Sequence, residues 1–305
     1  MIKRCVEVSS GPAHLWVKNS QLVLTREGKE ISRIPIEDLG VLVIDNPSIT
    51  YTHAALAAMM EKNVAVVVCG HDHHPAGLLL PVEGHTLHGA TVAMQSSATE
   101  RAKNSLWKGI IAAKIRNQAY ALKIMGKEGA GLEALSRRVK SGDPENLEAQ
   151  AAQRYWPMLL GPAFRRSRDG GPPNNLLNYG YMVLRAATAR AVCGAGLHPS
   201  LGIHHRNQYN GFALADDLME PVRPMVDLIV CGLWKEGKIE LSRESKEKLL
   251  GVLAAPVELS GQNSPLMTAL QKSAASLREA LSGESGGLNI PKPALSLHLQ
   301  DREDD

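Results

Sequence analysis

The character of the chain changes between Gly84 and Gly89, and this change limits the folds that are open to it. Before it, short β-rich segments alternate with turn residues. From Ser97 onward, long stretches lack the alternation of a strand and are rich in residues that favour helices. We therefore predict an α+β protein, with a small, mostly β amino-terminal domain (1–88), a larger all-helical domain (89–285) and an extended or disordered tail (286–305).

Four strands are predicted near the amino terminus, arranged as a meander of hairpins. They are Ala13–Lys18, Gln21–Thr25, Glu30–Ile34 and Gly40–Ile44. An Ala- and Met-rich helix is predicted from Thr52 to Glu61, followed by a buried strand from Val64 to Cys69.

For three helices of the second domain, the sequence also predicts where they begin or end. The first is a long helix from Ser97 to about Met125, and the second begins after Asp143, with Asp143 as its cap and Pro144 in its first position. The third runs from about Leu176 to Cys193, after a basic loop rich in Gly and Pro.

The amino terminus does not resemble a signal peptide, because Glu7 follows its two positive charges before any apolar stretch develops. Apolar runs such as Val64–Cys69 are far shorter than the ~20 residues that span a bilayer. We expect no membrane segment and a cytoplasmic location. The four cysteines lack the close spacing of a zinc or redox motif, and we expect reduced thiols at Cys5, Cys69, Cys193 and Cys231.

Positive charge is concentrated in one region, although the net charge of the chain is only +3. Residues 101–140 hold ten Lys or Arg and two Glu, a local charge of +8. Such a region is able to follow a phosphate backbone, but a solvated helix face has the same composition.

Acidic side chains with helical spacing are the main candidates for chemistry. Asp216 or Asp217 falls one turn before Glu220, so two carboxylates share one face of a helix. Such acids repel each other unless a cation joins them. A divalent Mg²⁺ or Mn²⁺ ion is one solution, and a surface ion pair with Arg223 is the other. Glu148 lies on another helix, where a solvated glutamate is the ordinary interpretation.

Four motifs occur together in the chain, in a fixed order. They are Glu148-Ala-Gln-Ala-Ala-Gln-Arg-Tyr-Trp, Asn178-Tyr-Gly-Tyr, Gly202-Ile-His-His and Asp217-Leu-Met-Glu-Pro-Val-Arg-Pro. In this order they resemble the CRISPR-associated integrase/endonuclease family, and the resemblance covers nearly the whole chain. It is closest to members that accompany type II systems.

The resemblance implies a helical catalytic domain in which Glu148, His205 and Glu220 hold one Mg²⁺ or Mn²⁺ ion. Many relatives have Asp in the last position, so it stays open whether Asp217 assists as a second-shell or a direct ligand. His204 matches the family's histidine less well than His205 does. Five arginines are expected to hold DNA phosphates: Arg137, Arg138, Arg165, Arg166 and Arg168. For Tyr155 and Asn178, packing and substrate contact are both open.

The partners are likewise implied by the resemblance. The chain is expected to form a homodimer through its β-rich domain and to work with a small companion protein of the adaptation complex. Its substrates are expected to be double-stranded DNA, both the spacer precursor and the CRISPR repeat that the spacer's 3′-hydroxyls attack. The type II effector nuclease is a further possible partner.

Three alternatives stay open. A histidine-rich segment offers ligands for a zinc hydrolase site, although a solvent-exposed loop is the favoured interpretation. Its residues are His71, Asp72, His73, His74, His85 and His88. The second alternative is a non-catalytic DNA-binding scaffold. The third is a general metal-dependent nuclease, in which water replaces the DNA hydroxyl as the nucleophile.

Overall fold

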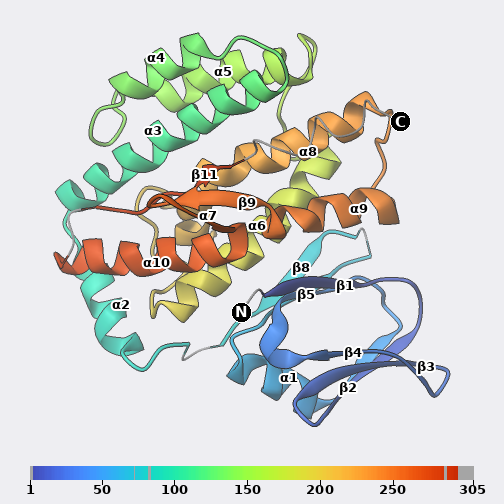
Figure 1. Cartoon of the computed structure of the whole chain (residues 1–305). Coiled ribbons are helices and arrows are strands. Elements are labelled where there is room, and N and C mark those ends of the chain that lie inside the picture. Colours follow the sequence, from blue (N-terminus) through green and yellow to red (C-terminus); the bar gives the residue numbers. More distant parts are fainter. Residues whose placement is uncertain (1–2, 72, 82–83, 285–286, 295–305) are drawn as a thin grey trace.

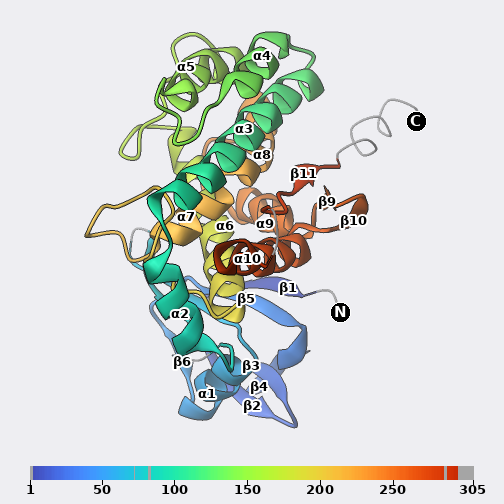
Figure 2. The same cartoon turned by 90° about the vertical axis from the view of Figure 1, so that its left-hand side faces the viewer.

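The computed structural model describes residues 3–71, 73–81, 84–284 and 287–294. A β-rich part lies at one end of the molecule and a larger helical part at the other, and both views separate them clearly (Figures 1 and 2). The predicted α+β class, with the β-rich region first, is confirmed. The last strand of the β-rich part ends at Leu79 and the first helix of the helical part starts at His88, while the predicted domain limits stay a prediction.

The β-rich part of the described chain consists of two four-stranded sheets and helix α1 (His53–Glu61). One sheet has the order β1-β5-β7-β8 and the other the order β4-β3-β2-β6. The strands are β1 (Arg4–Val8), β2 (Ala13–Lys18), β3 (Gln21–Arg26), β4 (Lys29–Pro35), β5 (Leu39–Ile44), β6 (Ile49–Tyr51), β7 (Ala65–Cys69) and β8 (Pro75–Leu79).

The predicted meander is right for β2, β3 and β4 and wrong for the fourth strand. Strand β5 instead pairs in parallel with β1 and β7 in the other sheet. All six residues of β5 are buried, because both faces of this strand are covered. Leu42 and Ile44 face the core of the β-rich part, whereas Val41 and Val43 belong to the core of the helical part. The sheet therefore joins the two cores.

The helical part is built around α6, which is buried along most of its length. Its helices are α2 (His88–Ser97), α3 (Glu100–Ile124), α4 (Ala130–Arg138), α5 (Leu147–Leu160), α6 (Asn174–Gly194), α7 (Ala213–Met219), α8 (Arg223–Lys235), α9 (Arg243–Leu250) and α10 (Leu266–Ser282). Two short 3-10 turns, η2 (Glu220–Val222) and η3 (Gly251–Ala254), lie in the described helical part, and a third, η1 (Ile36–Asp38), lies in the β-rich part. No helix in the described ranges is long and apolar enough to cross a bilayer.

Two of the predicted helix starts need correction. The long helix begins at Glu100 rather than Ser97, because Thr99 is extended and its hydroxyl accepts a hydrogen bond from the backbone N–H of Ala102. Ser97 ends the preceding helix α2. Asp143 and Pro144 do not begin α5, which is capped by Asn146 and starts at Leu147.

The prediction of an all-helical second domain also needs a correction. Strands β9 (Pro256–Leu259), β10 (Gln262–Pro265) and β11 (Lys292–Pro293) form a small antiparallel sheet there. Ser260 and Gly261 both have positive φ angles of 53° and 78°, as in a two-residue hairpin turn. Part of the predicted tail is thus an extended strand, while residues 295–305 lie outside the described residues.

Candidate active site

The side chains of Glu148 and Glu220 meet at one cation, the ammonium of Lys114. Nζ of Lys114 lies 2.5 Å from Oε1 of Glu148 and 2.6 Å from Oε2 of Glu220. These residues come from α5, η2 and α3, so three segments distant in sequence converge. Burial opposes the charge on Lys114, but Glu220 and Glu148 outweigh it and raise the pKa of the ammonium.

Glu220 is the more deeply buried of the two acids, with 2% of its surface exposed. Burial works against its charge, yet Arg223 and Lys114 hold the pKa of the carboxyl below its ordinary value. Arg223 contacts Oε1 at 3.0 Å, from one turn further along the chain. Oε2 makes no hydrogen bond of normal geometry within the described part of the chain, so Lys114 meets it as an ion contact only. The surface ion pair considered from the sequence is therefore a buried network.

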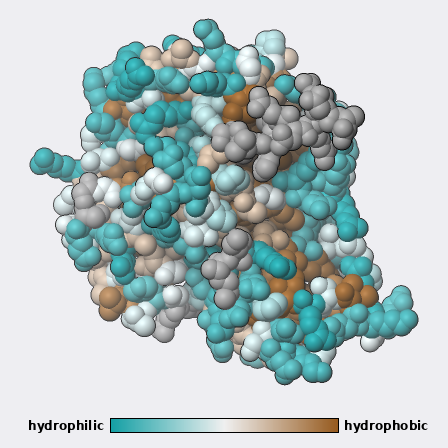
Figure 3. Space-filling view, viewed as in Figure 1, coloured by the Kyte–Doolittle hydropathy of each residue, from teal (hydrophilic) through white to brown (hydrophobic). Residues whose placement is uncertain are grey.

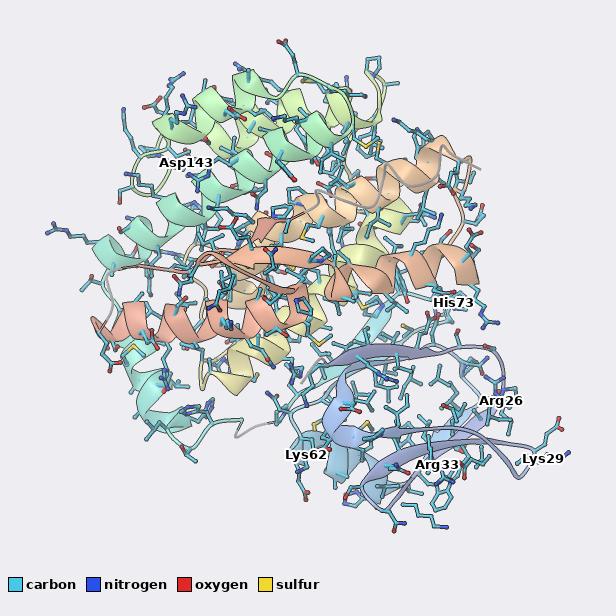
Figure 4. All side chains as sticks on the ribbon, viewed as in Figure 1. Arg26, Lys29, Arg33, Lys62, His73 and Asp143 are labelled. Atoms are coloured by element: carbon cyan, nitrogen blue, oxygen red, sulfur yellow. The ribbon has the colours of Figure 1, made fainter. Side chains whose placement is uncertain are left out.

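The start of α5 fixes the position of Glu148. Asn146 adopts a left-handed conformation, with φ of 50°, and its side chain caps the helix at the N–H of Ala149. Asp143 was predicted as the cap, and its carboxylate does accept hydrogen bonds from the N–H groups of Leu147 (2.9 Å) and Glu148 (3.0 Å). A buried carboxylate and an amide thus share the capping of this helix. Figure 4 labels Asp143 at this end of the helical part.

His205 is held by Asp217, which is fully buried. Oδ1 of Asp217 lies 2.5 Å from Nδ1 of the imidazole, and this hydrogen bond raises the pKa of His205. The same carboxylate accepts from the backbone N–H groups of Ile203, His204 and His205. Both oxygens of Asp217 are therefore occupied by hydrogen bonds from the histidine loop.

Gly202 allows the histidine loop to fold closely around the carboxylate of Asp217. A Cβ at this position would lie 2.4 Å from the carbonyl oxygen of His205 and 3.0 Å from Oδ2 of Asp217. The glycine of the Gly202-Ile-His-His motif is explained by this close approach.

The ring of His204 packs on a buried indole. It stacks on the buried Trp107 with ring centroids 4.1 Å apart and planes 2° from parallel, while His205 meets the same indole edge-on at 5.8 Å. The ring of His204 is thus held by packing against Trp107.

Behind Glu220, two tyrosines of the motifs bind one buried acid. Asp227 accepts a hydrogen bond from Tyr155 at 2.9 Å and another from Tyr181. Burial raises the pKa of Asp227 to about 6, although both hydroxyls oppose the shift. The guanidinium of Arg223 lies over the Tyr181 ring, 5.0 Å from its centroid. The packing interpretation of Tyr155 is confirmed, since its side chain is fully buried.

The Asn178-Tyr-Gly-Tyr motif of α6 connects several parts of the molecule. Asn178 accepts from Arg166 and donates to the carbonyl of Arg168, both at 2.7 Å, and so shapes the basic loop. Tyr179 donates to Glu7 of the β-rich part at 3.1 Å. Gly180 allows α8 to approach, because a Cβ there would lie 2.4 Å from Val226.

A cavity of about 670 Å³ opens between the β-rich part and the helices. Glu148 and Glu220 do not line it, but Arg223, which pairs with Glu220, does. Four arginines line it together with polar and apolar groups. They are Arg166, Arg168, Arg185 and Arg223. Arg166 is tied to Asn174 and Asn178, and Arg185 forms a bidentate pair with Asp216. Arg168 is exposed, so its charge is available at the cavity mouth.

The other predicted DNA contacts lie elsewhere. Arg165 donates to the carbonyls of Pro162 and Phe164 on the outer side of the loop and does not line the cavity. Arg137 and Arg138 are exposed at the end of α4, where Arg138 pairs with Glu145 at 3.2 Å. Sequence reasoning missed Lys114 and Arg185. The only available signal for Lys114 was its place in the basic region.

The histidine-rich segment gives no support to a zinc site. Nδ1 of His73 bonds Asp45 at 2.9 Å, where the β-rich part meets the helices (Figure 4). His85 instead contacts Arg278, and His88 bonds the carbonyl of Gly196. Asp72 lies outside the described residues. These histidines contact separate partners and share no common centre.

The predicted ligands fit a divalent cation by their donor chemistry and by the position of the acids. Within the described ranges, no three His, Cys, Asp or Glu side chains stand close enough to hold an ion as they are. Glu148 and Glu220 nevertheless both contact one positive group, the ammonium of Lys114, which takes the place of an ion between them. Carboxylate oxygens with one imidazole suit Mg²⁺ or Mn²⁺.

Comparison with known proteins assigns the family. The family model described as "CRISPR associated protein Cas1" matches residues 6–254. The chain belongs to the Cas1 family. Its Cas1 relatives include a CRISPR-associated endonuclease Cas1 of Neisseria meningitidis serogroup C, which is 34% identical over 91% of this chain and 92% of the relative. A second relative of that kind, from Pyrobaculum aerophilum, is 27% identical over 90% of this chain and 98% of its own.

Solved structures share the fold of this Cas1 chain. A casposase bound to integration product superposes with a TM-score of 0.77 at 20% identity, covering 100% of this chain and 96% of the casposase. A CAS1 protein from Thermotoga maritima gives a TM-score of 0.75 at 17% identity over 93% of this chain and 99% of its own. The family model and the Neisseria meningitidis relative confirm, at the level of the family, the resemblance noted in the sequence.

Proposed function

We propose that this Cas1 chain is a metal-dependent DNA integrase of CRISPR adaptation, which joins the 3′-hydroxyls of a spacer precursor to the CRISPR repeat. The observation that carries the proposal is the convergence of Glu148 and Glu220 on one cation, together with Arg223, which pairs with Glu220 and lines an arginine-rich cavity. Acidic groups that hold a cation next to a basic DNA track are what phosphoryl transfer between DNA strands requires. The relatives named as endonucleases and the casposase bound to integration product support the same chemistry.

In the proposed site, Glu148, Glu220 and Nε2 of His205 hold one Mg²⁺ or Mn²⁺ ion. The ion, when bound, supplies Lewis-acid stabilisation of the charge that develops on the scissile phosphate. Asp217 holds Nδ1 of the imidazole and so leaves Nε2 for this role. Arg223 fixes Oε1 of Glu220 and orients this carboxylate toward Glu148.

DNA phosphates are proposed to enter along the arginine-lined cavity. Arg168 is the exposed charge at its mouth, and Arg166 is held in place by two asparagines of α6. Arg165, Arg137 and Arg138 lie farther along the surface and are proposed to follow the flanking duplex. These contacts position the DNA without reading bases.

The proposed assembly is a homodimer joined through the β-rich part, together with a small companion protein. One supporting observation is exposed apolar surface on that part, where Ile31 of β4 is 56% exposed and Tyr51 is 46% exposed. Figure 3 shows hydrophobic residues gathered toward the β-rich part on an otherwise mostly hydrophilic face. A solved Cas6-RT-Cas1–Cas2 complex contains a chain of which 35% shares this fold, with a TM-score of 0.71. The type II effector nuclease and the cytoplasmic location stay predictions.

Strand transfer tests the proposal directly. The purified chain and its companion are incubated with a short DNA duplex and a supercoiled plasmid that carries a CRISPR array, with Mn²⁺ or with EDTA. We expect joined products with Mn²⁺ and none with EDTA. Glu148→Gln, Glu220→Gln and His205→Ala are expected to lower joining by at least about a hundredfold each, the usual scale for loss of a group that stabilises transition-state charge.

Two controls separate the alternatives. Lys248→Gln, on α9 and in an exposed ion pair with Glu236, leaves the site intact and is expected to keep activity. Normal DNA binding without any joining by the wild type would favour the non-catalytic scaffold instead. Metal-dependent cutting without joining would favour a general nuclease, in which water takes the place of the 3′-hydroxyl.

A further inference from the structure

Lys114 lies between two proposed metal ligands, although it is itself no ligand. Its side chain is only 12% exposed, and its ammonium contacts an oxygen of Glu148 and an oxygen of Glu220. Burying a lysine is costly unless its charge is matched, and here two carboxylates from different segments match it. The ammonium thus removes the repulsion between the two acids.

The neighbouring Arg223 does not duplicate this contact. Arg223 binds Oε1 of Glu220, whereas Lys114 meets Oε2 of the same carboxylate. Glu148 comes from α5, and its Oε1 is the oxygen that Lys114 binds. The lysine therefore occupies the space between the acids, while the arginine braces one of them from the side.

We infer that Lys114 is a built-in counter-ion, which holds the two acids together without metal and competes with the divalent ion for their oxygens. The inference rests on the proposed metal site. An ion that binds both carboxylates must displace the ammonium from them, and the displaced charge still repels the ion at close range. Lys114 thereby sets the metal affinity of the site.

Metal binding measured by calorimetry tests the inference. Mn²⁺ is titrated into metal-free full-length protein, without DNA, for the wild type, Lys114→Met and Lys114→Arg. Lys114→Met removes the competitor, so the dissociation constant for Mn²⁺ is expected to fall about tenfold. Lys114→Arg keeps a charge that is able to bridge both acids, and its dissociation constant is expected to equal or exceed that of the wild type.

Lys127→Met is the matched control. Lys127 follows the same helix α3 and is also partly buried, but its ammonium donates to the carbonyls of Met158 and Leu159 at the end of α5. It ties the same two helices without touching either acid. Its replacement is expected to leave the affinity for Mn²⁺ within about twofold of the wild type, since no charge near the ion changes.

Thermal unfolding in EDTA gives a second measurement. Lys114→Met leaves Glu148 without its ion pair and the buried Glu220 with Arg223 as its remaining partner, so it is expected to melt several degrees lower than the wild type. Mn²⁺ is expected to raise its melting temperature more than that of the wild type. Near-ultraviolet circular dichroism confirms that each variant is folded, and Lys114→Arg carries the test if Lys114→Met does not fold.

Equal Mn²⁺ affinities for the wild type and Lys114→Met would overturn the inference but not the proposed metal site, since the wild type would still bind metal. An Mn²⁺ affinity for Lys114→Arg that is clearly higher than that of the wild type would overturn it as well. Failure of every variant to bind Mn²⁺ would end both the inference and the proposed metal site. Strand transfer by the wild type, measured separately, decides the proposed function.

Discussion

Asp217 and His205 form a carboxylate–imidazole pair in which Oδ1 lies 2.5 Å from Nδ1. The pair fixes the ring, because Asp217 is buried and is itself held by three backbone N–H groups. It also sets the protonation of the ring, since the hydrogen bond to Asp217 raises the pKa of His205 above its ordinary value of 6.5.

Asp217→Asn is expected to lower the pKa of His205, because the negative partner is lost. In the wild type, the stabilisation from the charged pair is fully present below pH 6.5 and is lost as the pH rises through the raised pKa. Titration of the imidazole resonances by NMR, in metal-free protein, measures the change. His88, which bonds a backbone carbonyl, is the internal control, and an unchanged pKa of His205 in the variant would contradict the prediction.

Gly202→Ala is expected to destabilise the chain by about 1–3 kcal/mol, the usual cost of overpacking. The added methyl group would overlap the carbonyl oxygen of His205, which is backbone and has little freedom to move. Gly211→Ala, at the other end of the same loop, has no neighbour within 4 Å and serves as the control. Urea unfolding measures both, and similar losses for the two variants would show that the close approach at Gly202 is unimportant.

Asp227 predicts a pH-dependent stability. Its pKa in the folded chain is about 6, above the ordinary 3.8, so the folded chain holds a proton there that the unfolded chain releases. The stability that the folded chain gains from binding that proton is fully present below pH 3.8 and is lost as the pH rises through 6. The stability of the wild type relative to Asp227→Asn should therefore decline over this interval and stay level at higher pH. Parallel pH profiles from urea unfolding would refute the assignment.

Much of the fold could be predicted from local sequence. Strand β2 matches its predicted bounds, and the order of the β-rich and helical parts follows from composition and periodicity alone. The pairing of β5 could not be predicted, because an uninterrupted apolar run shows that both faces are covered without showing which strands lie beside it. The cap of α5 was misplaced by three residues because Asp143 and Asn146 both cap it, and their sharing depends on the left-handed conformation of both residues.

The candidate site was only partly accessible to the same reasoning. The sequence motifs pick out both acids and His205, and the structure brings the acids together. Lys114 was missed because it lies 34 residues before Glu148 and 106 before Glu220, in a region where nine other basic residues give the same signal. Only tertiary packing distinguishes a buried bridging lysine from a solvated one.

Tyr179→Phe is expected to lower the free energy of unfolding by about 0.5–1.5 kcal/mol, the usual value of one hydrogen bond. The hydroxyl joins α6 to Glu7 of the β-rich part at 3.1 Å, and Lys246 reaches the same acid at 3.2 Å. Tyr51→Phe, on an exposed strand, removes a hydroxyl of the same kind and is the control. A loss of stability no greater than that control would mean that the hydroxyl of Tyr179 does not strengthen the contact between the two parts.

Arg168→Gln is expected to weaken DNA binding at low salt and to reduce the slope of log affinity against log salt by about one, as for one phosphate contact. Arg168 is exposed at the mouth of the cavity, so its loss leaves the internal hydrogen bonds of the loop in place. Fluorescence anisotropy with a labelled duplex at several salt concentrations measures the slope. Arg33→Gln, paired with Glu30 on the β-rich part, should leave the slope unchanged.

The three segments that carry Lys114, Glu148 and Glu220 meet only in the finished tertiary structure. A nascent or partly unfolded chain holds the same residues on separate pieces and cannot assemble the site from any one of them. Any activity that depends on these three residues together therefore requires the complete fold, and a proteolytic fragment that lacks one of the segments cannot carry it out.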